Sequence, residues 1–236
     1  MLHNVLAKLG IYYAKRRYMP RGIDWAWDIR RMRAGHDLGV AFDVGANIGQ
    51  TTALLLETFP GAAVHAFEPV KTTFDRLQRR FANAPHFSGH RLAVSDQSGT
   101  VQVLSDPESQ LNHIVARADL STGDVEAVEA VTVDSFCVER GIAHIDILKI
   151  DTEGHELQVL HGAREMFRQG QVDWVFAEVT FDPGDRSHSS FSAVEAWLAG
   201  HGLAVWCFYE HYHTGDGDLL FCNALFARRS GFQRAG

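Results

Sequence analysis

Ionisable side chains gather where one apolar run of the sequence ends. The segment LKIDTEGHE, residues 148–156, contains Lys149, Asp151, Glu153, His155 and Glu156. Burying so many charges is costly unless they are paired, so the pattern favours chemistry at this point. Glu153 or His155 could act as a general base, the imidazole being nearer the ideal pKa, and Lys149 is a further catalytic candidate. Alternatively, Lys149 and Asp151 share one face of a strand and form a structural pair. Glu156 opens the next helix, where an acid is favoured by the helix dipole, and we expect it to be structural.

A second candidate site is the segment FDVGANIGQTT, residues 42–52, which follows the first apolar run. Gly45 permits a tight turn and close approach of a ligand, and Gly49 permits close entry into a helix. A dinucleotide fingerprint needs a third glycine in the pattern G-x-G-x-x-G. Asn47 and Gln50 occupy the second and third glycine positions here. The turn is therefore not shaped for a pyrophosphate, and the alternative is an ordinary glycine turn of an α/β protein.

Two acidic residues complete this second site. Asp43 ends the first expected strand, and Glu68 ends the second, 19 residues beyond Gly49. Open α/β sheets place a carboxylate on a ribose diol at about 20 residues from the glycine turn. An acidic pocket also suits a cationic ligand, such as a sulfonium with an α-amino group, better than it suits a phosphate.

Oxygen ligands for a metal ion are present as well. Asp151, Glu153 and Glu178, the last from the strand segment FAEV, could hold Mg²⁺ or a similar hard cation. His211 and His213, with Asp216 and Asp218, form a weaker candidate because they lie where a strand gives way to a Gly-rich loop. A loop that contacts the acceptor is favoured over a metal site for these four residues, and an ordinary hairpin loop is favoured most. Other candidate contacts are Gln110, Asn112, His113, Trp25, Trp27, Trp206 and Tyr209.

The elements that must position these residues follow from periodicity. Residues 2–18 read as a basic amphipathic helix, and residues 21–33 as a short helix or an extended arm. Strands are expected at 40–45, 63–67, 90–94, 101–104, 130–133, 146–150, 174–180, 203–209 and 219–227. Helices are expected at 49–59, 72–83, 134–140, 156–168 and 191–199. This alternation predicts a doubly wound, mostly parallel sheet, and the last two strands, which have no helix between them, should pair antiparallel.

Charge and composition divide the chain unevenly. The net charge of −7 is the sum of +6 in the first 33 residues and −13 in the remainder. We expect a basic helical extension over residues 1–36 and one domain over residues 37–236. The acidic domain argues against nucleic-acid binding. Three separated cysteines and no long apolar run or signal peptide indicate a cytoplasmic protein without stable membrane insertion.

The motifs FDVGANIG, FEP, LAVSD and ILKIDTEGHE occur in this order over about residues 38–180. Together they resemble the FkbM family of S-adenosylmethionine-dependent methyltransferases. The resemblance implies a class I methyltransferase (Rossmann-like) fold, S-adenosylmethionine as cofactor, and O-methylation of hydroxyls on sugars, glycolipids or secondary metabolites. It also implies a cofactor site made of residues from the two motifs and from the two neighbouring strand ends: Asp43, Gly45, Ala46, Asn47, Gly49, Glu68, Pro69, Ala93, Val94, Ser95 and Asp151. Glu68 would hold the ribose hydroxyls, and Ala93 to Ser95 would border the adenine.

The function expected from residues and resemblance is methyl transfer to a hydroxyl of a sugar, glycan or glycolipid. The proton of that hydroxyl could leave to Glu153 or His155, or a divalent cation could make it acidic. The family pattern supports Lys149, Asp151, Glu153 and Glu178 but does not fix position 155. Two alternatives remain: a non-sugar natural product as acceptor, or a non-catalytic cofactor-binding module docked by its basic N-terminus. That N-terminus could also serve as a lid or as the arm of a homodimer.

Overall fold

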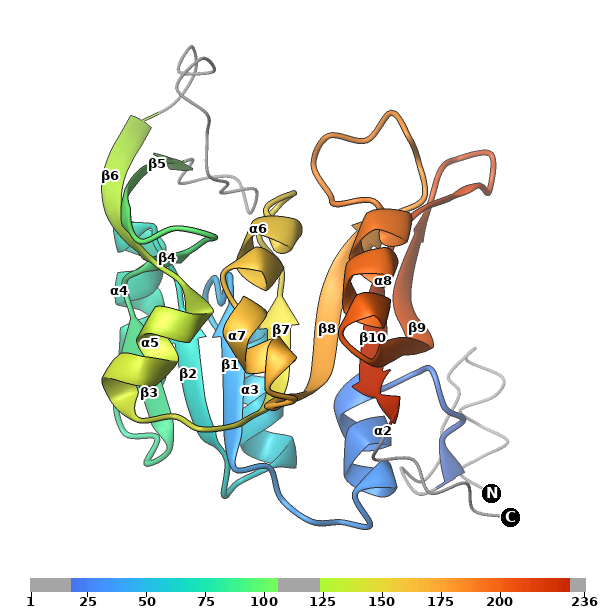
Figure 1. Cartoon of the computed structure of the whole chain (residues 1–236), viewed down its shortest axis with the longest axis horizontal. Helices are drawn as coiled ribbons and strands as arrows, with labels where there is room; N and C mark the ends of the chain where they lie inside the picture. The colour runs from blue at the N-terminus through green and yellow to red at the C-terminus, as the bar shows by residue number, and fades with distance from the viewer. Residues whose placement is uncertain (1–17, 106–123, 230–236) are drawn as a thin grey trace, which may run out of the picture.

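The computed structural model describes residues 18–105 and 124–229, and its centre is a seven-stranded sheet (Figure 1). The strand order is β3-β2-β1-β7-β8-β10-β9. The strands are β1 (Val40–Val44), β2 (Ala63–Phe67), β3 (Phe87–His90), β7 (Ile145–Ile150), β8 (Val172–Thr180), β9 (Leu203–His213) and β10 (Leu219–Arg228). The five neighbouring strands β3, β2, β1, β7 and β8 are parallel, whereas β10 runs antiparallel between β8 and β9. The expected sheet, including its antiparallel C-terminal pair, is confirmed.

Helices cover both faces of this sheet because its buried strands carry apolar side chains on both sides. In β1, Ala41 packs with one hydrophobic cluster and Phe42 with the other. One face is covered by α2 (Trp25–Met32), α3 (Gln50–Thr58) and α4 (Lys71–Arg80), the other by α5 (Val133–Arg140), α6 (Glu156–His161), α7 (Arg164–Arg168) and α8 (Phe191–Gly200). Within residues 18–105 and 124–229, no helix combines the length and the apolar character needed to cross a membrane.

A small second sheet lies beside the main one. It has the order β4-β6-β5, with β4 (Ala93–Val94), β5 (Gly99–Ser105) and β6 (Asp124–Val131). Val103 and Val128 of this sheet pack on Val70, the residue that caps the N-terminus of α4. The sequence predicted this second sheet only in part. The expected strand over 130–133 covers just the end of β6, which begins at Asp124, and the expected strand over 90–94 is wrong. In the structure β3 ends at His90, and β4 begins the second sheet at Ala93.

Helix α2 confirms the helical alternative for residues 21–33 and belongs to the core of the sheet. Trp25 stacks on Phe176 with ring centroids 4.5 Å apart, and the buried Tyr209 hydroxyl donates to Asp28 at 2.9 Å. Arg30 donates to the carbonyl of Thr58, and Arg33 lies 3.1 Å from Asp146. Part of the basic N-terminal charge is therefore bound to the domain. The expected helix over 2–18 falls outside the described residues apart from residue 18, and the domain boundary at 36 stays a prediction.

The helix expected over 156–168 is interrupted. Helix α6 ends at His161 and α7 begins at Arg164. A Cβ atom on Gly162 would lie 2.1 Å from the carbonyl oxygen of Ser95. The chain therefore touches the end of the second sheet directly at this glycine, a tertiary contact that the periodicity of the sequence does not reveal.

Candidate active site

Two turns meet at the carboxyl ends of β1 and β7. Gly45, which follows β1, has a φ of 74°, and a Cβ atom there would lie 1.8 Å from the carbonyl oxygen of Asp151, which follows β7. Gly49 has a φ of 86°, and a Cβ atom there would clash with Phe81 and Leu77 of the α4 region. Both glycines are thus required by the protein's own packing, in addition to any ligand they admit.

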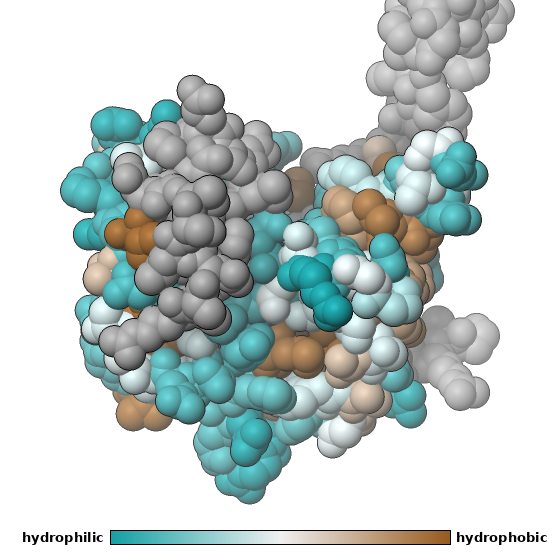
Figure 2. Space-filling view, turned by 90° about the horizontal axis from the view of Figure 1, so that it is seen from above, coloured by the Kyte–Doolittle hydropathy of each residue, from teal (hydrophilic) through white to brown (hydrophobic). Residues whose placement is uncertain are grey.

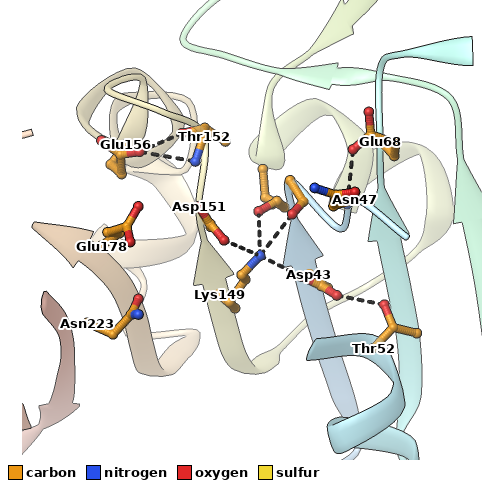
Figure 3. Close-up of polar contacts among 12 residues, drawn as sticks. Asp43, Asn47, Thr52, Glu68, Lys149, Asp151, Thr152, Glu156, Glu178 and Asn223 are labelled. Atoms are coloured by element: carbon orange, nitrogen blue, oxygen red, sulfur yellow. Dashed lines mark hydrogen bonds and ion pairs between the residues drawn. The ribbon is translucent and has the colours of Figure 1, made fainter. Parts of the chain in front are cut away.

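A buried lysine connects these two turns (Figure 3). The Nζ atom of Lys149 lies 3.0 Å from Asp43 Oδ1 and 3.3 Å from Asp151 Oδ2, and it donates to the carbonyl of Gly45 at 2.9 Å. The other carboxylate oxygen of Asp43 accepts from the Thr52 hydroxyl at 2.6 Å. Burial lowers the pKa of Lys149, but Asp151 and Asp43 outweigh it and raise the pKa above its ordinary value. Lys149 therefore holds the two acids in place, and a catalytic role for it stays a prediction.

Glu68 lies at the end of β2, opposite the first glycine turn. Its carboxylate accepts the backbone N–H of Asn47 at 3.0 Å and that of Val70 at 2.9 Å. Burial raises the pKa of Glu68 to about 7, and these two hydrogen bonds oppose the rise. Glu68 borders a cavity. The other residues that line it come from the expected cofactor set and its neighbours: Val44, Gly45, Phe67, Pro69, Leu92, Ala93, Val94, Val103, Asp151 and Thr152.

A larger cavity adjoins the first one. The two share Gly45, Glu68 and Asp151 among their lining residues. The larger cavity also contains the carboxylates Glu153, Glu178 and Glu210, the ammonium group of Lys149, and the expected cofactor residues Ala46 and Asn47. Figure 2 looks onto this side of the molecule, the carboxyl ends of the parallel strands, where hydrophilic surface is interspersed with hydrophobic patches. The structure thus brings together most of the residues expected from the two motifs.

Strained backbone is concentrated around the larger cavity. Among the described residues, four that are not glycine have a positive φ, and three of them, Asn47, Glu153 and Glu210, line this cavity. Such a conformation costs about 1–3 kcal/mol per residue and occurs mainly at functional sites. The strain at Glu210 coincides with a bulge of β9, where the pairing shifts between Phe221 and Asn223 of β10. Asn223 donates to Glu210 at 2.7 Å and fixes its direction.

The strained turn at Glu153 is stabilised by hydrogen bonds to Glu156, a residue for which sequence analysis expected a structural role. One carboxylate oxygen of the fully buried Glu156 accepts from the backbone N–H groups of Thr152 and Gly154 and from the Thr152 hydroxyl, each at 3.1 Å. The other oxygen accepts from the N–H of Ser189 at 3.1 Å. Glu156 therefore fixes the turn that carries Glu153 and joins it to the loop before α8.

His155 lies apart from the other catalytic candidates. Its Nε2 atom is 2.8 Å from the hydroxyl oxygen of Ser95, and burial lowers the pKa of its imidazole. Among the described residues, neither His155 nor Ser95 lines the two cavities above, whereas Glu153 lines the larger one. His155 therefore joins α6 to the end of β4, and its role as a base stays a prediction that this placement does not favour.

Sequence analysis missed a histidine in this site. His188, in the loop before α8, has its Nε2 atom 3.2 Å from Glu178 Oε2 and its Nδ1 atom 2.7 Å from Asp185 Oδ2. Burial lowers the pKa of His188, but its hydrogen bonds to Glu178 and Asp185 outweigh burial and raise it to about 9. A ligand atom from each of Glu153, Glu178 and His188 lies within 4.8 Å of the others. The structure thus groups two expected metal ligands with His188, while the third, Asp151, pairs with Lys149.

The signal that could have found His188 is its position in the chain. The loop follows the carboxyl end of a parallel strand, the edge at which open α/β sheets bind ligands. An aromatic pair that also escaped sequence analysis lines the cavity beside it. Tyr212 stacks on Phe221 with ring centroids 4.4 Å apart, and Phe221 stacks on His188 at 4.3 Å.

The remaining candidates have other placements. Trp25 and Tyr209 are core residues, although Trp25 borders a smaller pocket next to Lys149, and Trp206 lies under Arg21. His211 and His213 belong to β9, which extends to His213 before the loop begins, and their ring centroids are 6.4 Å apart. Among the described residues, neither His211 nor His213 belongs to a group of side chains that could hold a metal ion. Gln110, Asn112 and His113 lie outside the described residues.

Comparisons with known proteins agree with this geometry. Residues 43–203 match a family model described as the methyltransferase FkbM domain. The chain is 30% identical over 233 residues to the 31-O-demethyl-FK506 methyltransferase FkbM of Streptomyces tacrolimicus, covering 82% of this chain and 79% of that protein. It is 29% identical over 197 residues to the hexuronic acid methyltransferase AglP of Haloferax volcanii, covering 77% of each. Among solved structures, the METTL16 MTase domain aligns with a TM-score of 0.50 and 10% identity, covering 86% of this chain and 65% of that one, a likeness of fold alone.

Proposed function

Because the chain belongs to the FkbM methyltransferase family and has the class I methyltransferase fold, we propose that it transfers a methyl group from S-adenosylmethionine to a hydroxyl of a sugar, glycan or glycolipid. The observation that carries this proposal is the pair of adjoining cavities that share Gly45, Glu68 and Asp151. One is suited to the cofactor and the other to the acceptor.

Glu68 and the first glycine turn support cofactor binding. The Glu68 carboxylate is positioned at the end of β2, where such sheets bind a ribose diol, and it lines both cavities. Ala93 and Val94 provide apolar wall on the side assigned to the adenine. Asp151, which also lines both cavities, would stabilise the sulfonium and the α-amino group by charge.

Methyl transfer to a hydroxyl is an in-line displacement. The acceptor oxygen forms a bond to the methyl carbon while the carbon–sulfur bond breaks, and its electron pair remains on sulfur to give neutral S-adenosylhomocysteine. The protein must align the two reactants and remove the hydroxyl proton. Glu153, Glu178 and Glu210 are the cavity carboxylates available for this second task, either as proton acceptors or as ligands of a cation that makes the hydroxyl acidic.

The aromatic pair Tyr212 and Phe221 supports a sugar acceptor, because the apolar face of a sugar ring stacks on such side chains. Tyr212 is 51% exposed at the cavity wall and thus accessible to a ligand. The name of the relative AglP also specifies a hexuronic acid. The alternative acceptor, a non-sugar natural product, is favoured by the name of the FK506-modifying relative. The proposal includes the cytoplasm as the location and a homodimer as the assembly.

The proposal is tested in two steps. Isothermal titration calorimetry should show binding of S-adenosylmethionine and no comparable binding of NAD. A screen of glycans with S-adenosylmethionine labelled in the methyl group should then yield a labelled product. Cofactor binding without transfer to any glycan or natural product would favour the non-catalytic binding module, and binding of NAD alone would overturn the assignment.

A further inference from the structure

We propose that Glu153, Glu178 and His188 bind a divalent transition-metal cation, of the type of Mn²⁺ or Zn²⁺, at the wall of the larger cavity. One ligand atom from each side chain lies within 4.8 Å of the other two. The binding of the cation stands on this geometry, and its catalytic role rests on the proposed function.

Three different segments contribute to the site. Glu153 lies in the turn after β7, Glu178 in β8, and His188 in the loop before α8. The buried Glu156 binds Gly154 N–H with one oxygen and Ser189 N–H with the other. These are the residues next to Glu153 and His188 in the chain, so one side chain sets the relative positions of two ligands before any cation binds.

The orientation of His188 distinguishes this cluster from a solvated group of acids. Its Nδ1 atom lies 2.7 Å from Asp185, which leaves Nε2 facing Glu178. Histidine ligands of metals usually donate their second ring N–H to a carboxylate, which fixes the tautomer and the ring direction. Stacking on Phe221 at 4.3 Å further restricts the ring, and the side chain of His188 is only 10% exposed.

The distances also fit a shared cation. Nitrogen and oxygen ligands bind such ions at about 2.0–2.2 Å, so neighbouring ligands lie about 3 Å apart. The separation of His188 Nε2 and Glu178 Oε2 is 3.2 Å. Among the described residues that line this cavity, Lys149 supplies the ammonium group. That group already pairs with the carboxylates of Asp43 and Asp151. The cavity's other carboxylates, Glu68, Glu153, Glu178 and Glu210, have no ammonium partner among these lining residues, and a cation bound by Glu153 and Glu178 would offset part of their negative charge.

The ligand set changes the identity of the expected ion. Mg²⁺ prefers oxygen ligands in octahedral geometry, whereas imidazole favours first-row transition metals. With His188 in place of Asp151, the site is better suited to Mn²⁺ or Zn²⁺. Held by Glu153, Glu178 and His188, the cation would act as a Lewis acid that lowers the pKa of an acceptor hydroxyl.

The test uses the full chain and Mn²⁺ as a probe. Titration followed by electron paramagnetic resonance should show saturable binding of one Mn²⁺ per chain, and spin-echo modulation should show coupling to one imidazole nitrogen. Glu153→Gln should abolish saturable binding, and His188→Gln should remove the nitrogen coupling. Asp185→Asn removes the carboxylate that holds His188 Nδ1 but keeps an oxygen for the N–H of Ser187, and it should weaken Mn²⁺ affinity by about 10- to 100-fold.

Asp182→Asn is the matched control, because it makes the same charge change in the same loop at an exposed carboxylate whose hydrogen-bond partner, among the described residues, is Gly184 N–H. It should leave Mn²⁺ affinity unchanged. Absence of saturable Mn²⁺ binding to the wild type, or equal losses in Asp185→Asn and Asp182→Asn, would overturn the site. Methyl transfer that continues at full rate in EDTA would overturn the catalytic role of the cation while leaving the proposed function intact. Failure to bind S-adenosylmethionine would instead contradict the proposed function.

Discussion

The ammonium group of Lys149 lies 3.0 Å from the carboxylate of Asp43, and the two side chains are 5% and 0% exposed. They are partners in register on the parallel strands β7 and β1. The pair sits directly beneath the turn that contains Gly45, whose carbonyl also accepts from Lys149. A single buried ion pair therefore joins the two strand ends from which both cavities are built.

Replacing Lys149 should destabilise the fold. Lys149→Met keeps the length of the side chain but leaves Asp43 buried without its partner, and breaking such a pair costs about 3–5 kcal/mol. The free energy of unfolding in urea should fall accordingly. The surface variant Lys71→Met, which breaks the exposed pair with Asp75, should change it little. Recovery of stability in the double variant Asp43→Asn/Lys149→Met would identify the unpaired charge as the cause, and a small loss in Lys149→Met alone would contradict this account.

Gly45 should tolerate no side chain. Gly45→Ala introduces a Cβ atom 1.8 Å from a backbone oxygen of Asp151, in addition to the strain of a φ of 74°. Gly35→Ala provides the matched comparison, since Gly35 has a φ of 81° and no atom within 4 Å of the added carbon. Strain alone costs about 1–2 kcal/mol. We expect Gly35→Ala to lower the free energy of unfolding by about that amount and Gly45→Ala to lower it by considerably more. Equal effects would show that the contact between the two turns is unimportant.

The positions of these groups show how far the sequence could predict the site. Asp43, Gly45, Glu68, Lys149 and Asp151 were found because each lies within a few residues of a strand end, and the carboxyl ends of parallel strands share one edge. Strand periodicity was sufficient for that part. Gly45 was expected to permit a tight turn and the close approach of a ligand, and only the structure shows that it also makes room for the carbonyl of Asp151.

Loops and irregular backbone account for what the sequence could not predict. His188 reaches the site through a loop whose course depends on the hydrogen bond between Ser189 and Glu156, 33 positions apart in the chain. Glu210 faces the cavity because of a bulge in β9. The break between α6 and α7 lies at Gly162, where the chain contacts Ser95. Each is a tertiary contact with no local pattern.

Glu156 should matter for turnover without touching a substrate. Glu156→Gln keeps the volume but removes the charge from a carboxylate that accepts four hydrogen bonds. Hydrogen bonds to charged groups are worth about 1.5–3 kcal/mol, so stability should fall by at least that amount. We expect kcat to fall as well while S-adenosylmethionine binding is retained. Glu165→Gln, an exposed acid paired with Arg168, should affect neither property. Unchanged kcat in Glu156→Gln would contradict its role in positioning Glu153 and His188.

Cofactor binding should depend on pH through Glu68. Burial raises the pKa of Glu68 to about 7 in the free protein, whereas the ribose hydroxyls donate best to the ionised carboxylate. Below pH 7 the Glu68 carboxyl must therefore lose its proton before the cofactor binds. The affinity for S-adenosylmethionine should rise about tenfold between pH 6 and pH 8. Calorimetry at several pH values measures this change.

Glu68→Gln is the control for that titration. The amide cannot ionise, so the affinity for S-adenosylmethionine should be lower at pH 8 than in the wild type and should lose the rise between pH 6 and pH 8. A wild-type affinity that does not change with pH, or a variant that keeps the full pH dependence, would show that Glu68 does not hold the ribose.

The most direct test of the account follows the methyl group itself. The protein is incubated with S-adenosylmethionine carrying a ¹³C-labelled methyl group and with a panel of glycans, and the product is examined by ¹³C nuclear magnetic resonance. The account predicts a new methoxy signal on a sugar carbon, together with S-adenosylhomocysteine in equal amount. A label found on nitrogen or carbon, or S-adenosylmethionine recovered intact with every acceptor of the panel, would contradict it.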